Sequence, residues 1–192
     1  CPDVIADIRN HCASEPQSRA GFGYHPGMKN AAQFQPPVNS IVPPIRNSVR
    51  ALIVRKNQVL LLRKRSGNGA QRYALPGGGQ DRGETLHECV LRECREEIAA
   101  KVDILGLAHV ANAFKPLDAK LISYRQQVEF IFFCGLPKNY KPRLGKKPDK
   151  NQIGVEWVGL DRLNKIDLRP QGIGSLIRRA ASGKAPTYAG TL

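Results

Sequence analysis

The chain has 192 residues, 41% hydrophobic and 24% charged, close to the averages of globular proteins. This length suits one domain with a sizeable core and some residues left over. The 30 Lys and Arg residues exceed the 16 Asp and Glu residues by 14, and the pI is about 9.9. The longest apolar runs, such as Val59–Leu62, are too short to cross a bilayer, so we expect a protein without a membrane partner.

A positive excess of this size favours polyanionic partners, which makes nucleic acid a candidate, and a well-solvated basic surface is the equally weighted alternative. The five cysteines are odd in number and form no CxxC pair, so the sequence predicts neither a disulfide framework nor a zinc site. A reducing compartment follows, and we expect the cytoplasm. Because the sequence begins with Cys rather than Met, an organelle is the alternative location.

Residues 1–44 differ in amino-acid composition from the rest of the chain. Four prolines, at positions 36, 37, 43 and 44, disfavour regular structure in the second half of this segment. We therefore predict a Pro-rich N-terminal extension over 1–44. Residues 45–192 are predicted to form one further domain, including a helix near the C-terminus.

The second segment alternates between apolar runs and turn residues. Runs rich in β-branched residues predict strands, in chain order, over 49–55, 59–63, 102–110, 122–134 and 154–158, the first two forming a hairpin. The remaining predicted elements are a glycine turn at 76–79, helices over 84–99 and 171–181, and a basic loop over 138–150. Because strands outnumber helices without strict alternation, we predict an α/β (α+β) fold in which a mixed β-sheet is sandwiched between helices.

The predicted helix over 84–99 carries three glutamates on the side opposite its apolar residues. Glu93, Glu96 and Glu97 stand at i, i+3 and i+4, so they are neighbours on the helix surface. Neighbouring carboxylates repel one another, and a hard cation such as Mg²⁺ or Mn²⁺ removes that repulsion because it prefers oxygen ligands. The glycines of the preceding turn let backbone groups approach a phosphate closely. The sequence therefore predicts a site for a divalent cation and a phosphate.

The same region resembles a known motif. Gly78 is followed after five residues by Glu84 and, after seven more, by the run RECREEIAA over 92–100. This spacing is similar to the Nudix box, which reads G, five residues, E, seven residues, R-E-U-x-E-E-x-G-U, where U is aliphatic. Two positions depart from the pattern: Cys94 stands at an aliphatic position, and Ala99 stands at a glycine, where helices often end in the left-handed conformation. Neither departure removes an acidic residue, and a looser resemblance extends over residues 48 to 168.

The resemblance to Nudix hydrolases of the MutT-like and ADP-ribose pyrophosphatase-like kind implies roles for these residues. It implies that Glu93 and Glu97 are the main ligands of Mg²⁺ (or Mn²⁺), with Glu96 as a third ligand or a water-mediated partner. A backbone carbonyl of Gly77 or Gly78 is expected to add a further ligand.

Two residues of the implied catalytic set have a supporting role. Arg92 is expected to pair with Glu84 and to fix the loop against the helix. The general base varies within the family, and it stays open among Glu96, Glu97, Asp149 and Glu129.

Residues near the glycine turn are candidates for substrate binding. The predicted set comprises Arg63, Arg65, Arg72, Tyr73, Gly78 and Gly79, with Lys64 beside them in the same basic run. For the basic residues, phosphate contact and a solvated strand end are equally weighted. Tyr73 could stack on a base, and a half-buried sheet position is the favoured alternative.

The resemblance implies a metal-dependent pyrophosphohydrolase that acts on acid anhydrides. Its substrate would be a nucleoside diphosphate linked to another moiety: a nucleotide sugar, an ADP-ribose-like compound or a nucleoside triphosphate. The alternative is an RNA 5′-end pyrophosphohydrolase, or a basic RNA-binding Nudix module in a ribonucleoprotein assembly. For the loop over 138–150, a solvated loop is favoured over phosphate contact. A homodimer is the expected oligomer, should the chain self-associate.

Overall fold

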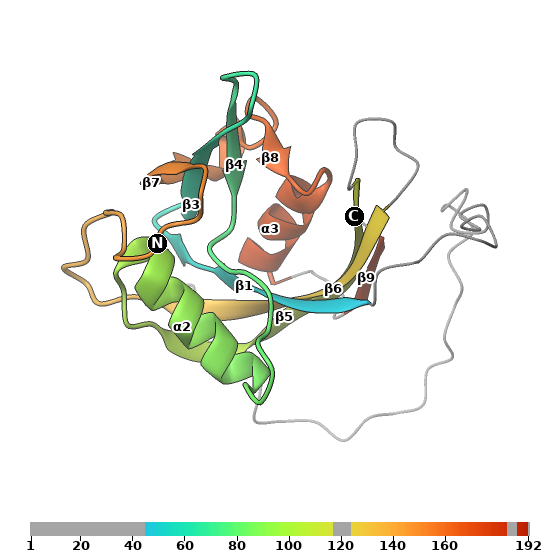
Figure 1. Ribbon diagram of the computed structural model, residues 1–192. Coiled ribbons are helices and arrows are strands. Elements are labelled where there is room, and N and C mark those ends of the chain that lie inside the picture. Colours follow the sequence, from blue (N-terminus) through green and yellow to red (C-terminus); the bar gives the residue numbers. More distant parts are fainter. Residues whose placement is uncertain (1–44, 117–123, 184–187, 192) are drawn as a thin grey trace, which may run out of the picture. The chain divides into compact units, whose positions relative to one another are not determined.

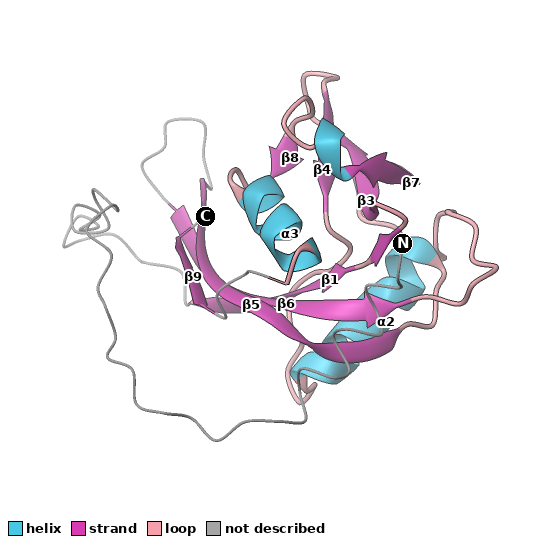
Figure 2. Ribbon diagram, turned by 180° about the vertical axis from the view of Figure 1, so that it is seen from behind, coloured by secondary structure: helices cyan, strands magenta, loops and turns pink. Residues whose placement is uncertain are grey.

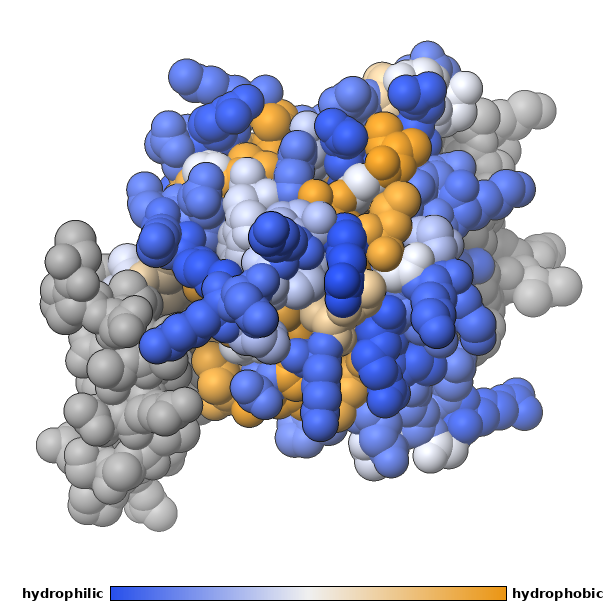
Figure 3. Space-filling model, turned by 90° about the vertical axis from the view of Figure 1, so that its left-hand side faces the viewer, coloured by the Kyte–Doolittle hydropathy of each residue, from blue (hydrophilic) through white to orange (hydrophobic). Residues whose placement is uncertain are grey.

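The computed structural model describes residues 45–116, 124–183 and 188–191 of the chain. The predicted extension over 1–44 lies outside these residues. No helix in the described part is long and apolar enough to cross a membrane. The face seen in Figure 3 is covered mainly by hydrophilic side chains, with apolar ones in small patches between them.

Sheet A is the larger curved layer at the bottom of Figure 1. Its strands, in spatial order, are β1 (Arg46–Leu52), β6 (Tyr124–Gly135), β5 (Asp103–Pro116) and β9 (Tyr188–Thr191). β1 runs parallel to β6, β6 is antiparallel to β5, and β9 is parallel to β5. The parallel pairing of β1 with β6 joins residues 81 positions apart in the sequence, such as Arg46 and Gln127. It therefore places polar residues of both strands on one wall of the site.

Sheet B stands across sheet A and is centred on β3. Its strands are β2 (Val54–Arg55), β3 (Gln58–Arg65), β4 (Gln71–Ala74), β7 (Gln152–Gly159) and β8 (Leu168–Arg169). β2 and β3 form a hairpin whose two turn residues, Lys56 and Asn57, both have positive φ, of 48° and 61°. This is the turn geometry that matches the twist of paired strands, so the predicted hairpin is confirmed.

Two helices cover opposite faces of sheet A, α2 (Leu86–Ile98) on one side and α3 (Ile173–Ala181) on the other (Figures 1 and 2). Alternate residues of β1 point to the two sides, because successive side chains of a strand face opposite ways. Val49 and Ala51 pack with the apolar stripe of α2, and Leu52 packs with α3. A short 3-10 helix, Leu160–Arg162, follows β7. The predicted mixed fold with flanking helices is thus confirmed, with two sheets in place of one.

The basic loop between β6 and β7 packs against the C-terminal end of α2. The backbone N–H of Gly145 donates to the carbonyl of Glu97 at 3.0 Å, and that of Lys147 donates to the carbonyl of Glu96 at 3.1 Å. The hydroxyl of Tyr140 donates to the carbonyl of Ile98 at 2.8 Å. These contacts satisfy carbonyls that a helix end leaves without internal partners. The loop therefore fixes the helix turn that carries the candidate acids.

Candidate functional site

The glycine turn between β4 and α2 lies against β1. The backbone N–H of Val49 donates to the carbonyl of Gly78 at 2.8 Å. Gly77 has φ +136°, and a Cβ on it would lie 2.1 Å from the Val49 carbonyl oxygen. A Cβ on Gly78 would lie 2.3 Å from a carboxylate oxygen of Glu93. The backbone contact at Gly77 requires glycine, and a side chain at Gly78 would displace the Glu93 carboxylate, so the turn brings backbone and carboxylate together at one place.

Helix α2 has defined signals at both ends. At its start, the Thr85 hydroxyl accepts from the Glu88 N–H at 3.2 Å, and the Glu88 carboxylate accepts from the Thr85 N–H at 2.8 Å, a capping box. At its end, Ala99 has φ 49° and ψ 38°, the left-handed conformation. Ala99 thus adopts the left-handed helix ending for which glycine is the usual residue. The acids before it therefore keep their positions on the helix.

Glu97 is the most buried of the three acids, with a side chain only 4% exposed. It accepts a hydrogen bond from the Gly77 N–H at 2.7 Å, and its other oxygen lies 3.9 Å from the Lys64 ammonium. Burial raises the pKa of Glu97 to about 7, although Lys64 and the Gly77 N–H favour the ionised form. Its negative charge is therefore incompletely compensated by the protein.

Glu93 lies one helical turn before Glu97 and is 13% exposed. Burial raises its pKa, and the hydrogen bond from Arg92, 2.9 Å long, opposes this shift. Glu96 is more open, at 30% exposed, and lies 3.6 Å from Arg92 and 3.9 Å from Lys147. The two more buried carboxylates are thus those that a further cation would stabilise most.

Arg92 and Glu84 form the expected brace between loop and helix. The guanidinium of Arg92 donates to both oxygens of Glu84, at 2.8 and 3.1 Å, and to the carbonyl of Gly79 at 3.1 Å. The same contacts lower the pKa of Glu84. The predicted pairing is confirmed. It also makes Arg92 a positioning residue, because its atoms bind the turn and the acid and hold them together.

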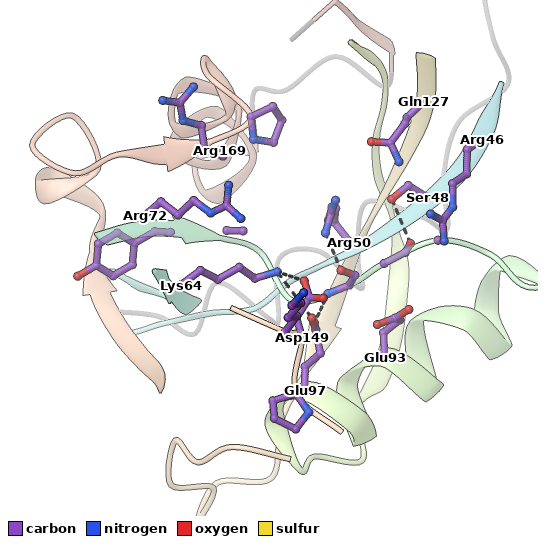
Figure 4. Close-up of a pocket in the computed structure, with 18 of the residues that line it drawn as sticks. Arg46, Ser48, Arg50, Lys64, Arg72, Glu93, Glu97, Gln127, Asp149 and Arg169 are labelled. Atoms are coloured by element: carbon purple, nitrogen blue, oxygen red, sulfur yellow. Dashed lines mark hydrogen bonds and ion pairs between the residues drawn. The ribbon is translucent and has the colours of Figure 1, made fainter. Parts of the chain in front are cut away.

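The acids face a cavity of about 940 Å³ between the two sheets. In Figure 4, Glu93 and Glu97 project from α2, while Lys64, Arg72 and Arg169 come from the opposite wall. Further along, Arg46, Ser48 and Gln127 line the wall formed by sheet A. Eight Lys and Arg side chains line this cavity, against five Asp and Glu side chains. Such a lining suits a phosphorylated ligand.

Four of the predicted substrate-binding residues line the cavity: Arg72, Tyr73, Gly78 and Gly79. Arg63 and Arg65 do not. They flank Lys64 on β3, so they point to the other face of sheet B, where Arg63 pairs with Glu156 at 3.9 Å. Lys64 faces the cavity and is ion-paired with Asp149.

Several lining residues were not predicted from the sequence: Arg46, Arg50, Arg125, Gln127 and Arg169. Arg50 is buried and pairs through two nitrogens with Glu129, at 2.7 and 3.2 Å, while also donating to the Gly77 carbonyl at 2.6 Å. Glu129, named above as a candidate base, is therefore engaged in holding Arg50. The available signal was the alternation of the polar Ser48 and Arg50 with the apolar Val49 and Ala51 on β1, where both polar residues are buried.

Within the described residues, no three or more His, Cys, Asp or Glu side chains are gathered closely enough to hold a metal ion unaided. The three glutamates share one cavity, and Arg92, Lys147 and Lys64 each lie within 4 Å of one or two of them. The expected convergence of three carboxylates is thus replaced by two partly buried acids and one on the rim.

A helix with one buried and one partly buried acid behind a glycine turn, beside a cavity between two sheets, defines a class of phosphate-handling protein. The sequence model of the NUDIX domain matches residues 44–179, which is most of the chain. The chain belongs to the NUDIX domain family.

Three known proteins illustrate this relationship. "Putative nudix hydrolase 1" of Caenorhabditis elegans is 26% identical over 143 residues, which cover 71% of this chain and 36% of that protein, so the chain spans about a third of this relative's length. The structure of a MutT protein from Methanosarcina mazei Go1 is 25% identical, with a TM-score of 0.58, covering 77% of this chain and 100% of the other. A UDP-X diphosphatase is 23% identical with a TM-score of 0.56, covering 78% and 68%. The last likeness shows the fold alone.

Proposed function

We propose that this chain is a divalent-metal-dependent pyrophosphohydrolase that cleaves an acid anhydride in a nucleotide-like substrate. The observation that carries the proposal is the position of Glu93 and Glu97, two partly buried acids one helical turn apart, on a cavity whose basic lining side chains outnumber the acidic ones. Membership of the NUDIX domain family supports it. So does the hydrolase name of the Caenorhabditis elegans relative.

The donor set fits Mg²⁺ or Mn²⁺ held jointly by protein and substrate. Mg²⁺ in proteins commonly keeps several waters and takes one or two carboxylates together with substrate phosphate oxygens. We assign the protein ligands to Glu93 and Glu97, with Glu96 reached through water and the Gly77 carbonyl as a further candidate. A bound ion would polarise the phosphoryl oxygens and favour ionisation of the attacking water.

The surrounding side chains would bind and orient the substrate. Lys64 and Arg72 face the acids from sheet B and would neutralise phosphate oxygens. Arg50, held by Glu129, keeps the Gly77 carbonyl in place. Glu96 and Asp149 both line the cavity without being buried, and we assign acceptance of the water proton to one of these two.

The test is turnover of a substrate panel with Mg²⁺, analysed by mass spectrometry. The panel contains nucleoside triphosphates, nucleotide sugars and ADP-ribose, and we expect two phosphorylated products from at least one of them. Glu93→Gln should lower kcat by about 10³-fold, because the neutral amide is a poor ligand for a hard cation. Lys165→Gln, an exposed change outside the cavity lining, is the matched control. A Glu93→Gln variant with wild-type turnover would contradict the assignment of Glu93 as a ligand of the metal ion.

A second candidate is an RNA 5′-end pyrophosphohydrolase or an RNA-binding module. The observation in its favour is that Lys147 and Lys150, from the basic loop, line the same cavity. A 5′-triphosphate RNA added to the panel tests the hydrolase form, which requires release of pyrophosphate or phosphate. RNA binding that persists in Glu93→Gln without any turnover in the wild type would favour the binding module.

A further inference from the structure

The wall of the cavity formed by sheet A carries polar groups that the proposed metal site does not use. Arg46 on β1 lies directly opposite Gln127 on β6, so the two side chains share one face of the sheet. Arg125 stands two residues before Gln127 and points to the same face. All three line the cavity. Figure 4 places Arg46 and Gln127 on the side away from Lys64 and Arg72.

Gln127 is only 3% exposed, and its amide oxygen has no hydrogen-bond partner among the described residues. An amide that lacks a partner in a buried position is costly, and proteins rarely keep one without a reason. A half-turn about the last side-chain bond exchanges oxygen and nitrogen, so the same position can present an N–H donor. Gln127 can therefore accept a hydrogen bond from a ligand or donate one to it.

Arg46 and Arg125 decide between these two possibilities. Neither takes part in an ion pair among the residues that the structure describes. The guanidinium of Arg46 lies over Gly79, where a Cβ would come within 2.0 Å of its nitrogens, so the glycine turn supports it at the cavity edge. Two guanidiniums that have no ion pair in the described part of the chain, beside an amide, make a site for an anion.

The charge of the whole cavity also favours a ligand with several negative charges. The eight basic and five acidic lining side chains differ by three, and Glu129, outside the lining, neutralises Arg50, which leaves an excess of two positive charges before any cation binds. A divalent ion on Glu93 and Glu97 would increase this excess by two. A diphosphate diester, with two negative charges, leaves half of it uncompensated, whereas a chain of three or more phosphates carries more negative charge and leaves less.

We propose that Arg46, Arg125 and Gln127 form a subsite for a phosphate group additional to the scissile diphosphate. This inference rests on the proposed function and names its substrate class: compounds with three or more linked phosphates. The two guanidiniums bind the added phosphate, and the Gln127 amide donates an N–H to it. The phosphate chain can belong to a free nucleotide or to the 5′ end of an RNA, because the subsite reads only the anion.

The test is calorimetric binding of inorganic tripolyphosphate and of pyrophosphate to the full chain in metal-free buffer. The wild type should bind tripolyphosphate about tenfold more tightly than pyrophosphate, since only the longer chain reaches the subsite. Arg46→Gln and Arg125→Gln should each remove most of this preference. Arg179→Gln, an exposed arginine on α3 outside the cavity lining, should keep it.

Gln127→Leu separates binding from folding. Removing an unsatisfied buried amide should leave the Tm equal to or above that of the wild type. Binding of tripolyphosphate should nevertheless weaken about tenfold, while pyrophosphate binding changes less than twofold. A lower Tm with unchanged phosphate preference would assign Gln127 a structural role and overturn its place in the subsite.

Equal affinities of the wild type for the two phosphates would overturn the proposal, as would an equal loss of preference in Arg179→Gln. Because no metal and no turnover enter this measurement, its result is independent of the hydrolase assignment. Turnover of the substrate panel can fail while the tripolyphosphate preference stands, and the reverse also holds. In an active enzyme, 5′-triphosphate RNA and nucleoside triphosphates distinguish the two sources of the phosphate chain.

Discussion

Glu97 combines burial with incomplete charge compensation. Its pKa of about 7 in the folded chain exceeds the ordinary value of 4.5, mainly because burial disfavours the carboxylate. The folded state therefore binds the proton more tightly than the unfolded state does. Stability from this group is present below pH 4.5 and is lost as the pH rises to about 7.

Glu97→Gln should raise the stability of the metal-free protein above pH 7. The amide keeps an oxygen for the Gly77 N–H and carries no buried charge, so we expect a gain of up to about 3 kcal/mol. At pH 4, below the ordinary pKa, the gain should almost vanish. Thermal unfolding between pH 4 and 8 measures this, with Glu96→Gln, on the cavity rim, as control. A Glu97→Gln variant that is less stable than the wild type at every pH would contradict the incompletely compensated charge on Glu97.

Single residues also show where the sequence was insufficient. The spacing from Gly78 to Glu97 is local, so the acids and the Arg92–Glu84 pair could be predicted. Whether Arg63 or Lys64 faces the cavity depends on how β3 pairs with β4 and β7, and the run of basic residues hides the alternation. The sequence therefore predicted a basic end of β3, but not which of its side chains face the cavity.

At the scale of the element, α2 is the best-predicted part of the fold. The expected range 84–99 agrees with the observed Leu86–Ile98, because the apolar spacing and the capping box are both local signals. The short strands β4, β8 and β9 were not predicted, since each has two to four residues and owes its shape to its neighbours. The pairing of β1 with β6 could not be predicted either, because it joins distant segments of the sequence. The wall that carries Arg125 and Gln127 was therefore missed as well.

Ala99→Gly should stabilise the protein. Alanine in the left-handed conformation is strained by contact between its Cβ and the backbone, and glycine relieves this strain. We expect a gain of about 1 kcal/mol, or a Tm increase of about 2–4 °C. Ala181→Gly, at the end of α3 in ordinary helical geometry, should have the opposite sign. Differential scanning fluorimetry compares the two. A lower Tm for Ala99→Gly would show that the strain is absent.

Gly145→Ala should detach the basic loop from α2. The added Cβ would lie 2.0 Å from the carbonyl oxygen of Glu96, a backbone atom that cannot move aside. The loss of the hydrogen bond to the Glu97 carbonyl should cost about 2 kcal/mol. Gly67→Ala, where a Cβ meets nothing within 4 Å, should change stability by less than about 0.5 kcal/mol. Chemical denaturation of both variants measures their free energies of unfolding. Equal values would contradict a stabilising contact between the basic loop and α2.

The molecule as a whole carries a net charge of +14, and part of this excess gathers around the cavity. Charge of one sign around a cleft attracts oppositely charged ligands and speeds their encounter. The basic composition therefore has a local use in addition to its effect on solubility. Nucleic acid as a partner stays a prediction, as do a homodimer and the cytoplasmic location.

The rate of encounter with an anionic substrate should fall with salt. Raising NaCl from about 50 to 300 mM should lower kcat/KM at least threefold and leave kcat almost unchanged, because screening acts on association. Arg72→Gln, which removes one cation of the lining, should flatten this dependence. Steady-state kinetics at several salt concentrations gives both values, and a salt-independent kcat/KM would speak against steering.

The claim on which the rest depends is that Glu93 and Glu97 together hold the divalent ion. Electron paramagnetic resonance of Mn²⁺ measures this ion directly, in the presence of tripolyphosphate as the partner ligand. We predict that the wild type immobilises Mn²⁺ and that the folded double variant Glu93→Gln, Glu97→Gln binds it at least about 100-fold more weakly. Mn²⁺ binding of equal strength in the two proteins would contradict the account.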